Sequence, residues 1–233
     1  MSKRKQPEQQ APPVQRLRIR YAKRGRARFT SHRDFARAFE RALRRAGIPM
    51  AYSSGFNPHP RISFANAAPT GAATESEYLE IGLAEVCDPA KVRDALDAAL
   101  PPGLDVLTVV AGGGAGLTDR LTGSRWRIEW KGFDPALTQR AVTALLDAGE
   151  VIVERLTKRG VRQFNAREAV IDLIVHPEAL EVLTRHLVPL VRPDDVVQAL
   201  TLVEPDLIIP PGVLLTRLEQ GELNGSEIAD PLQ

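Results

Sequence analysis

The sequence RLRIRYAKRGRARFT, residues 16–30, alternates arginine with apolar residues where the first strand is expected. Leu17 and Ile19 would share one face of an extended chain, because successive side chains of a strand point to opposite faces. We expect residues 26–29 to continue this strand beyond Gly25. The stretch therefore predicts a first strand with one buried face and one arginine-rich face.

The next stretch, SHRDFARAFERALRRAG, residues 31–47, predicts a helix with two different faces. Ser31 is a favourable N-cap with Asp34 three residues later, and Gly47 is a typical helix stop. At about 100° per residue, Phe and Ala side chains gather on one side of this helix. The other side carries five arginines, which we call the arginine ridge: Arg33, Arg37, Arg41, Arg44 and Arg45.

The first half of the chain continues into a β-α-β-β-α-β order. Residues 53–60 are too rich in Gly, Asn and Pro for a helix and are expected to form a loop. The order is that of ferredoxin-like units, in which both helices cover one face of a four-stranded sheet. The remaining elements expected here are strands at 61–66, 77–83 and 104–110 and a helix at 88–100.

The second half repeats much of this order. Its pattern predicts an α+β protein built from two ferredoxin-like units, the second one diverged, in a tandem duplication. The elements expected are strands at 126–130, 151–157, 168–175 and 213–218, and helices at 134–148, at 177–187 and from 192.

These patterns divide the chain into five segments. Two of them are predicted to be disordered because they are polar and lack hydrophobic periodicity. The segments are a basic tail at 1–15, a first unit at 16–111, a glycine-rich linker at 112–123, a second unit at 124–218 and a tail at 219–233.

The charge of the chain is unevenly distributed. Residues 1–46 contain fifteen Lys or Arg and three acidic residues, a balance of +12, although the whole chain has a formal net charge of only +2. An asymmetry of this size indicates a polyanionic partner, most often a nucleic acid. The alternative is a solvated basic segment that binds nothing in particular.

Composition excludes several classes of protein. The single cysteine, Cys87, rules out an internal disulfide and any cluster that needs three or four thiolates from this chain. No apolar run approaches the roughly 18 residues of a membrane-spanning helix, and no secretory leader is recognised. We expect a cytoplasmic protein without membrane contact, metal or cofactor.

The arginine ridge is the main candidate for nucleic-acid binding, because a guanidinium group can bind phosphate through two hydrogen bonds. The alternatives are a solvated face or pairing with the acidic side chains of Glu75, Glu77 and Glu80. Three further arginines lie close to the helix or loop in the sequence and join the candidate set: Arg26, Arg28 and Arg61.

The loop after the helix is the second candidate contact. Its aromatic residue, Phe56, would either stack on an unpaired base or fill the core, and the sequence leaves both alternatives open. Phe64 lies within a predicted strand and is expected in the core. The loop residues expected to contact RNA or a partner are Ser54, Gly55, Phe56, Asn57, Pro58 and Pro60.

No catalytic motif is recognised in the sequence. There is no P-loop, no GxGxxG after a strand and no GxSxG. Four residues could form a pocket for acid–base chemistry if the fold brought them together: His32, Asp34, His59 and Glu77. Two histidines without a third ligand at a recognisable spacing do not indicate a metal site.

Several of these stretches together resemble a known family. They are FTSHRD at 29–34, RALRRAGIP at 41–49, SGFNPHP at 54–60, FA at 64–65 and SEY at 76–78. They closely resemble the bacterial radical-SAM-linked protein family of unknown function. The resemblance is specific over about residues 16–85 and looser beyond them.

The resemblance implies a partner rather than a chemistry. The family's domain occurs alone or fused to cobalamin-binding radical SAM proteins, and stand-alone members are commonly encoded beside such a protein and a ribonuclease E/G-type gene. We therefore expect a non-catalytic accessory protein that binds or presents RNA to a separate cobalamin-dependent radical SAM enzyme, in RNA modification or processing. The alternatives are an enzyme in its own right and a protein-interaction module without nucleic-acid binding.

Overall fold

The computed structural model describes residues 9–158 and 160–233, which form two compact units. Among the described residues, unit 1 comprises 9–120 with 232–233, and unit 2 comprises the others from 121 to 231. The described residues hold α-helices and β-strands in both units, as the predicted α+β class requires. Residues 1–8 of the predicted basic tail lie outside the described residues, and residues 9–14 have no regular secondary structure.

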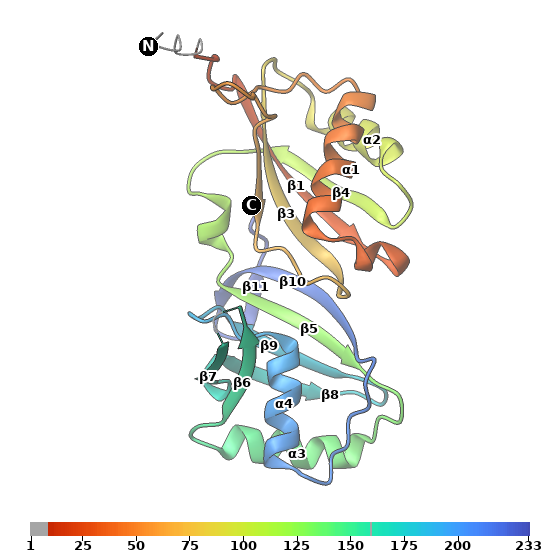
Figure 1. Cartoon of the computed structure of the whole chain (residues 1–233), viewed down its shortest axis with the longest axis vertical. Helices are drawn as coiled ribbons and strands as arrows, with labels where there is room; N and C mark the ends of the chain where they lie inside the picture. The colour runs from red at the N-terminus through yellow and green to blue at the C-terminus, as the bar shows by residue number, and fades with distance from the viewer. Residues whose placement is uncertain (1–8, 159) are drawn as a thin grey trace. The chain divides into compact units, whose positions relative to one another are not determined.

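Unit 1 has the β-α-β-β-α-β order predicted for it (Figure 1). Short 3-10 helices, η1 and η2, lie after β1 and after β4. The elements are β1 (Gln15–Lys23), η1 (Gly25–Phe29), α1 (His32–Arg45), β2 (Ile62–Ala65), β3 (Ala73–Leu83), α2 (Pro89–Ala99), β4 (Leu104–Ala111) and η2 (Leu117–Arg120).

The strands of unit 1 lie side by side in the order β4-β1-β3-β2, and the paired strands are antiparallel. Leu17 lies opposite Ile81 and Ile19 opposite Leu79 across the β1–β3 pair. All four side chains are completely buried. The alternation in β1 therefore has its predicted effect, with apolar side chains on one face and Arg16, Arg18 and Arg20 on the other.

Both helices of unit 1 cover the apolar face of its sheet (Figure 1). Phe35 and Phe39 of α1 and Leu96 of α2 belong to the same buried cluster as Leu17 and Ile19 of β1. The aromatic rings continue this packing, because Tyr21 stacks on Phe35 with ring centroids 4.5 Å apart. The helix α1 is thus fixed by its phenylalanine side, which leaves its arginine side outward.

Helix α1 begins and ends where the sequence predicts. The Ser31 Oγ accepts a hydrogen bond from the Asp34 backbone N–H at 3.2 Å and donates one to the Asp34 carboxylate at 2.7 Å. At the other end Gly47 has φ +65°, the left-handed conformation that favours glycine after a helix. Capping at both ends holds the helix between these residues.

The prediction that residues 26–29 continue the first strand is wrong, because these residues belong to η1. Gly25 has φ +52°, which turns the chain out of the extended conformation. The Ala27 and Thr30 N–H groups then donate to the carbonyls of Arg24 and Ala27. Alternating arginines are therefore compatible with a tight turn, and the glycine decides the conformation.

Unit 2 contains four strands that lie side by side, a short strand paired with one of them, and an additional hairpin. Two of its helices, α3 and α4, pack against each other. Its elements are β5 (Gly123–Glu129), α3 (Pro135–Asp147), β6 (Ile152–Thr157), β7 (Gly160–Asn165), η3 (Arg167–Ala169), β8 (Val170–Val175), β9 (Leu180–Arg185), α4 (Pro193–Val203), β10 (Leu214–Asn224) and β11 (Glu227–Ala229).

The main strands of unit 2 lie side by side in the order β10-β5-β9-β8, with antiparallel neighbours, and β11 pairs with β10. The strands β6 and β7 pair only with each other among the described residues. Without this hairpin, the order along the chain is β-α-β-β-α-β. The last, first, third and second of these strands lie side by side, as in unit 1.

Two predictions for unit 2 are wrong. Residues 177–187 were expected to be a helix, but they contain β9, a central strand between β5 and β8. Val182 and Leu183 are both buried there, so apolar side chains face both sides and the alternation typical of a strand is lost. Residues 219–233 are not a disordered tail, because β10 extends to Asn224 and β11 follows it.

Candidate nucleic-acid interface

The arginine ridge lies on the exposed side of α1. All five of its arginine side chains are exposed. On the opposite side Phe39 and Leu43 are buried with 0% and 1% of their surfaces exposed. The Arg45 guanidinium donates to the Ala99 carbonyl at 3.0 Å, so this member of the ridge also ties α1 to the end of α2.

The acidic residues considered as partners of the ridge are used elsewhere. Glu75 binds Arg24, which raises the pKa of that guanidinium through the hydrogen bond they share. Glu80 binds Arg16 and Arg18. Within residues 9–158 and 160–233, no ion pair neutralises a ridge arginine. The ridge therefore presents uncompensated positive charge on an ordered helix.

Glu77 is also unavailable to the ridge. Its side chain is 1% exposed and accepts hydrogen bonds from the Ala68 N–H at 3.0 Å and from the Tyr21 hydroxyl at 3.5 Å. Glu77 thus closes the turn between β2 and β3 against the core, which is a structural role.

The three additional arginines have different surroundings. Arg26 is exposed on η1. The Arg28 guanidinium lies 4.6 Å from the centroid of the Phe29 ring, and 60% of the Phe29 surface is exposed. The Arg61 Nε donates to the Tyr52 carbonyl at 3.0 Å, across the base of the 53–60 loop.

The loop is anchored at its base and exposed at its tip. The Ser53 N–H donates to the His59 carbonyl across the base of the loop at 2.8 Å. The His59 N–H donates to the Ser53 hydroxyl oxygen at 3.0 Å. Phe56 at the tip has 68% of its surface exposed, which decides the open question against a place in the core. Phe64 packs against the core cluster as predicted, 5.9 Å from Phe35 between ring centroids.

The four candidate catalytic residues do not form a pocket among the described residues. His32 packs edge-on against Phe64, with ring centroids 4.7 Å apart, and Asp34 caps α1. His59 is exposed in the loop, whereas Glu77 is buried. No hydrogen bond joins any two of these four side chains in the described part of the chain.

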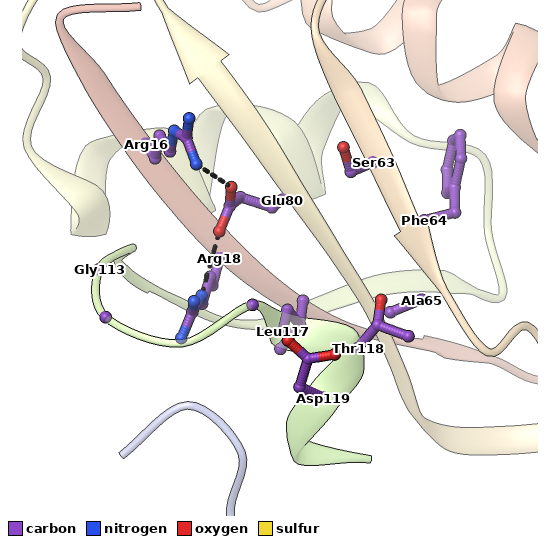
Figure 2. A pocket seen from close by; sticks show the side chains of 12 residues that line it. Arg16, Arg18, Ser63, Phe64, Ala65, Glu80, Gly113, Leu117, Thr118 and Asp119 are labelled. Carbon is purple, nitrogen blue, oxygen red and sulfur yellow. Dashed lines mark hydrogen bonds and ion pairs between the residues drawn. The ribbon is translucent and has the colours of Figure 1, made fainter.

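A site that sequence reasoning missed lies on the sheet face of unit 1 away from α1. It is a pocket of about 440 Å³ between β1, β2 and the segment from Gly113 to Asp119. Figure 2 shows the Arg16–Glu80–Arg18 chain of ion pairs on one side of it and Thr118 and Asp119 on the other. The glycine-rich stretch was the available signal, but it was interpreted only as a linker.

The described residues contain no group of three or more His, Cys, Asp or Glu side chains arranged to hold a metal ion. They also contain no helix that is long and apolar enough to cross a membrane. The partly buried Cys87 packs against the core cluster of unit 1.

Comparison with known proteins gives a family but no activity. No curated protein matches the chain. Among solved structures, one match is the X-ray crystal structure of a heavy metal efflux pump, at 12% sequence identity and a TM-score of 0.22. It covers 91% of this chain, which spans only 29% of the pump's length, and we base no argument on it. The model of a family described as an uncharacterized protein conserved in bacteria (DUF2344) matches residues 16–193, and the chain therefore belongs to this family.

Proposed function

We propose that this protein is a non-catalytic RNA-binding or substrate-presenting accessory protein and that the arginine ridge is its principal RNA contact. The observation that carries the proposal is the set of five exposed arginines on a capped, packed helix, without acidic partners in the described part of the chain. Arginines three or four residues apart on a helix are neighbours, so the ridge forms a row of phosphate-binding groups.

The spacing of the ridge suits an extended polyanion. Arg33, Arg37 and Arg41 recur every four residues, which corresponds to about 6 Å of rise per step. An ordered row of this kind contacts successive phosphates with less loss of side-chain freedom than a flexible tail would. The exposed Phe56 ring in the neighbouring sequence motif provides a face on which an unpaired base can stack.

We also propose that the RNA is presented to a separate cobalamin-dependent radical SAM enzyme, possessing its own iron–sulfur cluster, and that the pathway includes a ribonuclease of the E/G type. The family resemblance of the motifs at 29–34 and 54–60 supports this partner. The single cysteine agrees with it, because one thiolate cannot hold a radical SAM cluster.

For the fold, we propose that both units are ferredoxin-like and arose by internal duplication. The shared strand order, with β4-β1-β3-β2 in unit 1 and β10-β5-β9-β8 in unit 2, supports this proposal. The hairpin of β6 and β7 would then be an insertion between the first helix and the second strand of the repeat.

The test of RNA binding is a salt titration of affinity. For a single-stranded RNA, replacement of Arg37, Arg41 and Arg44 by Ala should lower the slope of log K against log salt by about 2, since each phosphate contact contributes about 0.7. Arg93→Ala is the matched control, because Arg93 is an exposed arginine on α2 that pairs with Asp94. Unchanged affinity and slope in the triple variant would refute the proposal.

The test of the partner is co-purification with the radical SAM protein before and after nuclease treatment. The proposal expects a complex whose RNA content falls in the ridge variant. A complex that contains no RNA, formed by a chain with no measurable RNA affinity, would identify a protein-interaction module instead.

A further inference from the structure

The pocket of Figure 2 continues into a second one on the same face of unit 1. The second pocket has a volume of about 320 Å³ and extends to Ser53, Pro60 and Arg61 at the base of the loop. Both pockets are lined by Arg16, Ser63 and Glu80, and so they adjoin. We call the two together the sheet trough. It runs from the SGFNPHP loop to η2.

The floor of the trough is formed by an ion pair, in which Arg18 compensates the charge of Glu80. The Arg18 Nε donates to Glu80 Oε2 at 3.1 Å, and the Arg18 side chain is 5% exposed. Its Nη2 also donates to the Ala115 carbonyl, which ties the glycine-rich segment over β1. Because Arg18 already compensates the charge of Glu80, this carboxylate does not repel an anion at the trough.

The loop end of the trough is cationic. Arg16 reaches Glu80 only at 3.4 Å, and 61% of its side chain is exposed, so most of its donors face solvent. Arg61 uses its Nε for the Tyr52 carbonyl, and the described residues provide no partner for its terminal nitrogens. Two guanidinium groups with free donors at one end offer the hydrogen-bond donors that a phosphate group accepts from.

The η2 end of the trough has the opposite character. Thr118 and Asp119 are exposed there, and no described side chain pairs with the Asp119 carboxylate. The Asp119 carboxylate lies against Gly116, where a Cβ would be 2.8 Å from Asp119 Oδ2 and would displace it. The Asp119 carboxylate is therefore an uncompensated acceptor at this end, and the hydroxyl groups of Thr118 and Ser63 also line the pocket.

We propose that the sheet trough binds one ribonucleotide unit, with its phosphate at Arg16 and Arg61 and its ribose 2′-hydroxyl donating to Asp119. A carboxylate is a suitable acceptor for a ribose hydroxyl, and the 2′-hydroxyl is the group that distinguishes RNA from DNA. The assignment of this ribonucleotide to an RNA strand rests on the proposed function. A free ribonucleotide offers the same chemistry.

The experiment compares three ligands on the full chain: an RNA oligonucleotide, the DNA oligonucleotide of the same sequence, and a free ribonucleoside 5′-monophosphate. Asp119→Asn should weaken RNA binding about tenfold, the typical cost of one hydrogen bond to a charged group, and leave DNA binding unchanged. Arg16→Ala should weaken the binding of both the RNA and the DNA oligonucleotide. Glu85→Gln is the control, because Glu85 is an exposed acid of unit 1 outside the trough.

The outcomes separate this inference from the proposed function. If RNA binds and depends on the ridge, but Asp119→Asn leaves the ratio of RNA to DNA affinity unchanged, the inference is overturned and the proposed function stands. If the monophosphate binds and requires Asp119 while RNA does not bind, the trough is a mononucleotide site and the proposed function fails. If neither the RNA nor the monophosphate binds the wild-type chain, both the inference and the proposed function are overturned.

Discussion

Phe39 shows how one residue fixes the orientation of the ridge. Its side chain is completely buried and packs beside Phe35, with ring centroids 5.7 Å apart. Phe39→Ala should lower the free energy of unfolding by about 3–5 kcal/mol, because the change removes buried apolar surface and leaves a cavity. Urea denaturation measures this loss.

The control is Arg37→Ala, on the exposed side of the same helix, which should change the free energy of unfolding by less than about 0.5 kcal/mol. A loss as large as that of Phe39→Ala would contradict the assigned orientation.

His186 is the residue whose protonation should couple stability to pH. Its Nδ1–H donates to the Leu121 carbonyl at 2.6 Å, so its neutral Nε2 accepts from the Ser124 hydroxyl at 2.7 Å. Burial lowers the pKa of His186, and the nearby charge of Arg217 adds to this effect. Because the folded-state pKa lies below the unfolded value of about 6.5, the unfolded chain binds the proton first as pH falls.

We therefore expect the free energy of unfolding to decrease as pH falls below about 6.5, until the folded-state pKa is reached. His186→Gln should remove this part of the pH dependence, whereas His59→Gln, at an exposed site, should retain it. Urea denaturation at pH 7.5, 6.5 and 5.5 measures the difference. The same pH slope in His186→Gln and wild type would show that another group is responsible.

At the scale of elements, prediction succeeded where one face of an element is clearly apolar. Helix α1 and strand β1 each combine a buried stripe with an arginine stripe, so their periods of 3.6 and 2 are visible in the sequence. The prediction of β9 failed because both faces of this strand are covered, and the prediction at η1 failed because Gly25, with a positive φ, turns the chain out of the extended conformation. Neither of these causes produces a periodic pattern.

The segment after β4 provides an element-scale prediction. Gly112 follows the last residue of β4 beside β1, and its N–H donates to the Arg16 carbonyl at 2.7 Å. A Cβ there would lie 3.2 Å from Arg16 Cβ and 3.3 Å from the Arg16 carbonyl oxygen. Gly112→Ala should destabilise the protein by about 1–3 kcal/mol, the usual range for overpacking. Thermal or urea denaturation measures the change.

The control for this prediction is the adjacent glycine. A Cβ at Gly113 would have no atom within 4 Å, so Gly113→Ala should be neutral or stabilise by up to about 1 kcal/mol. Equal effects of the two substitutions would mean that the close approach at Gly112 does not hold this segment in place.

At the scale of the whole molecule, the arginine ridge could be predicted and the sheet trough could not. The ridge lies within the fourteen residues of one helix, so its geometry follows from helical periodicity. The trough combines Arg16, Ser63 and Asp119, which are distant in sequence and meet only through strand pairing and the path of the glycine-rich segment. The glycine-rich stretch marks one wall of this site in the sequence, but no local pattern connects it with Arg16 and Ser63.

The excess positive charge of the N-terminal region provides the last prediction, because it includes both the ridge and the first eight residues. Deletion of residues 1–7 removes Lys3, Arg4 and Lys5 and no acidic residue, and so it removes the same charge as the triple ridge variant of Arg37, Arg41 and Arg44. A purely electrostatic partner would respond equally to both changes. Because the ridge is ordered on α1, we expect the triple ridge variant to lose more RNA affinity at 150 mM salt than the deletion does.

Fluorescence anisotropy with a single-stranded RNA, over a series of salt concentrations, measures both losses and both slopes. The deletion combined with the ridge substitutions should show the sum of the separate effects, since independent sites contribute additively. If the deletion abolishes binding and the ridge variant retains it, the RNA contact lies in the N-terminal residues and the ridge is a solvated face. That result would mean that the N-terminal basic residues bind the RNA. The expected result means that RNA binding depends on the arginines of one helix with a defined orientation.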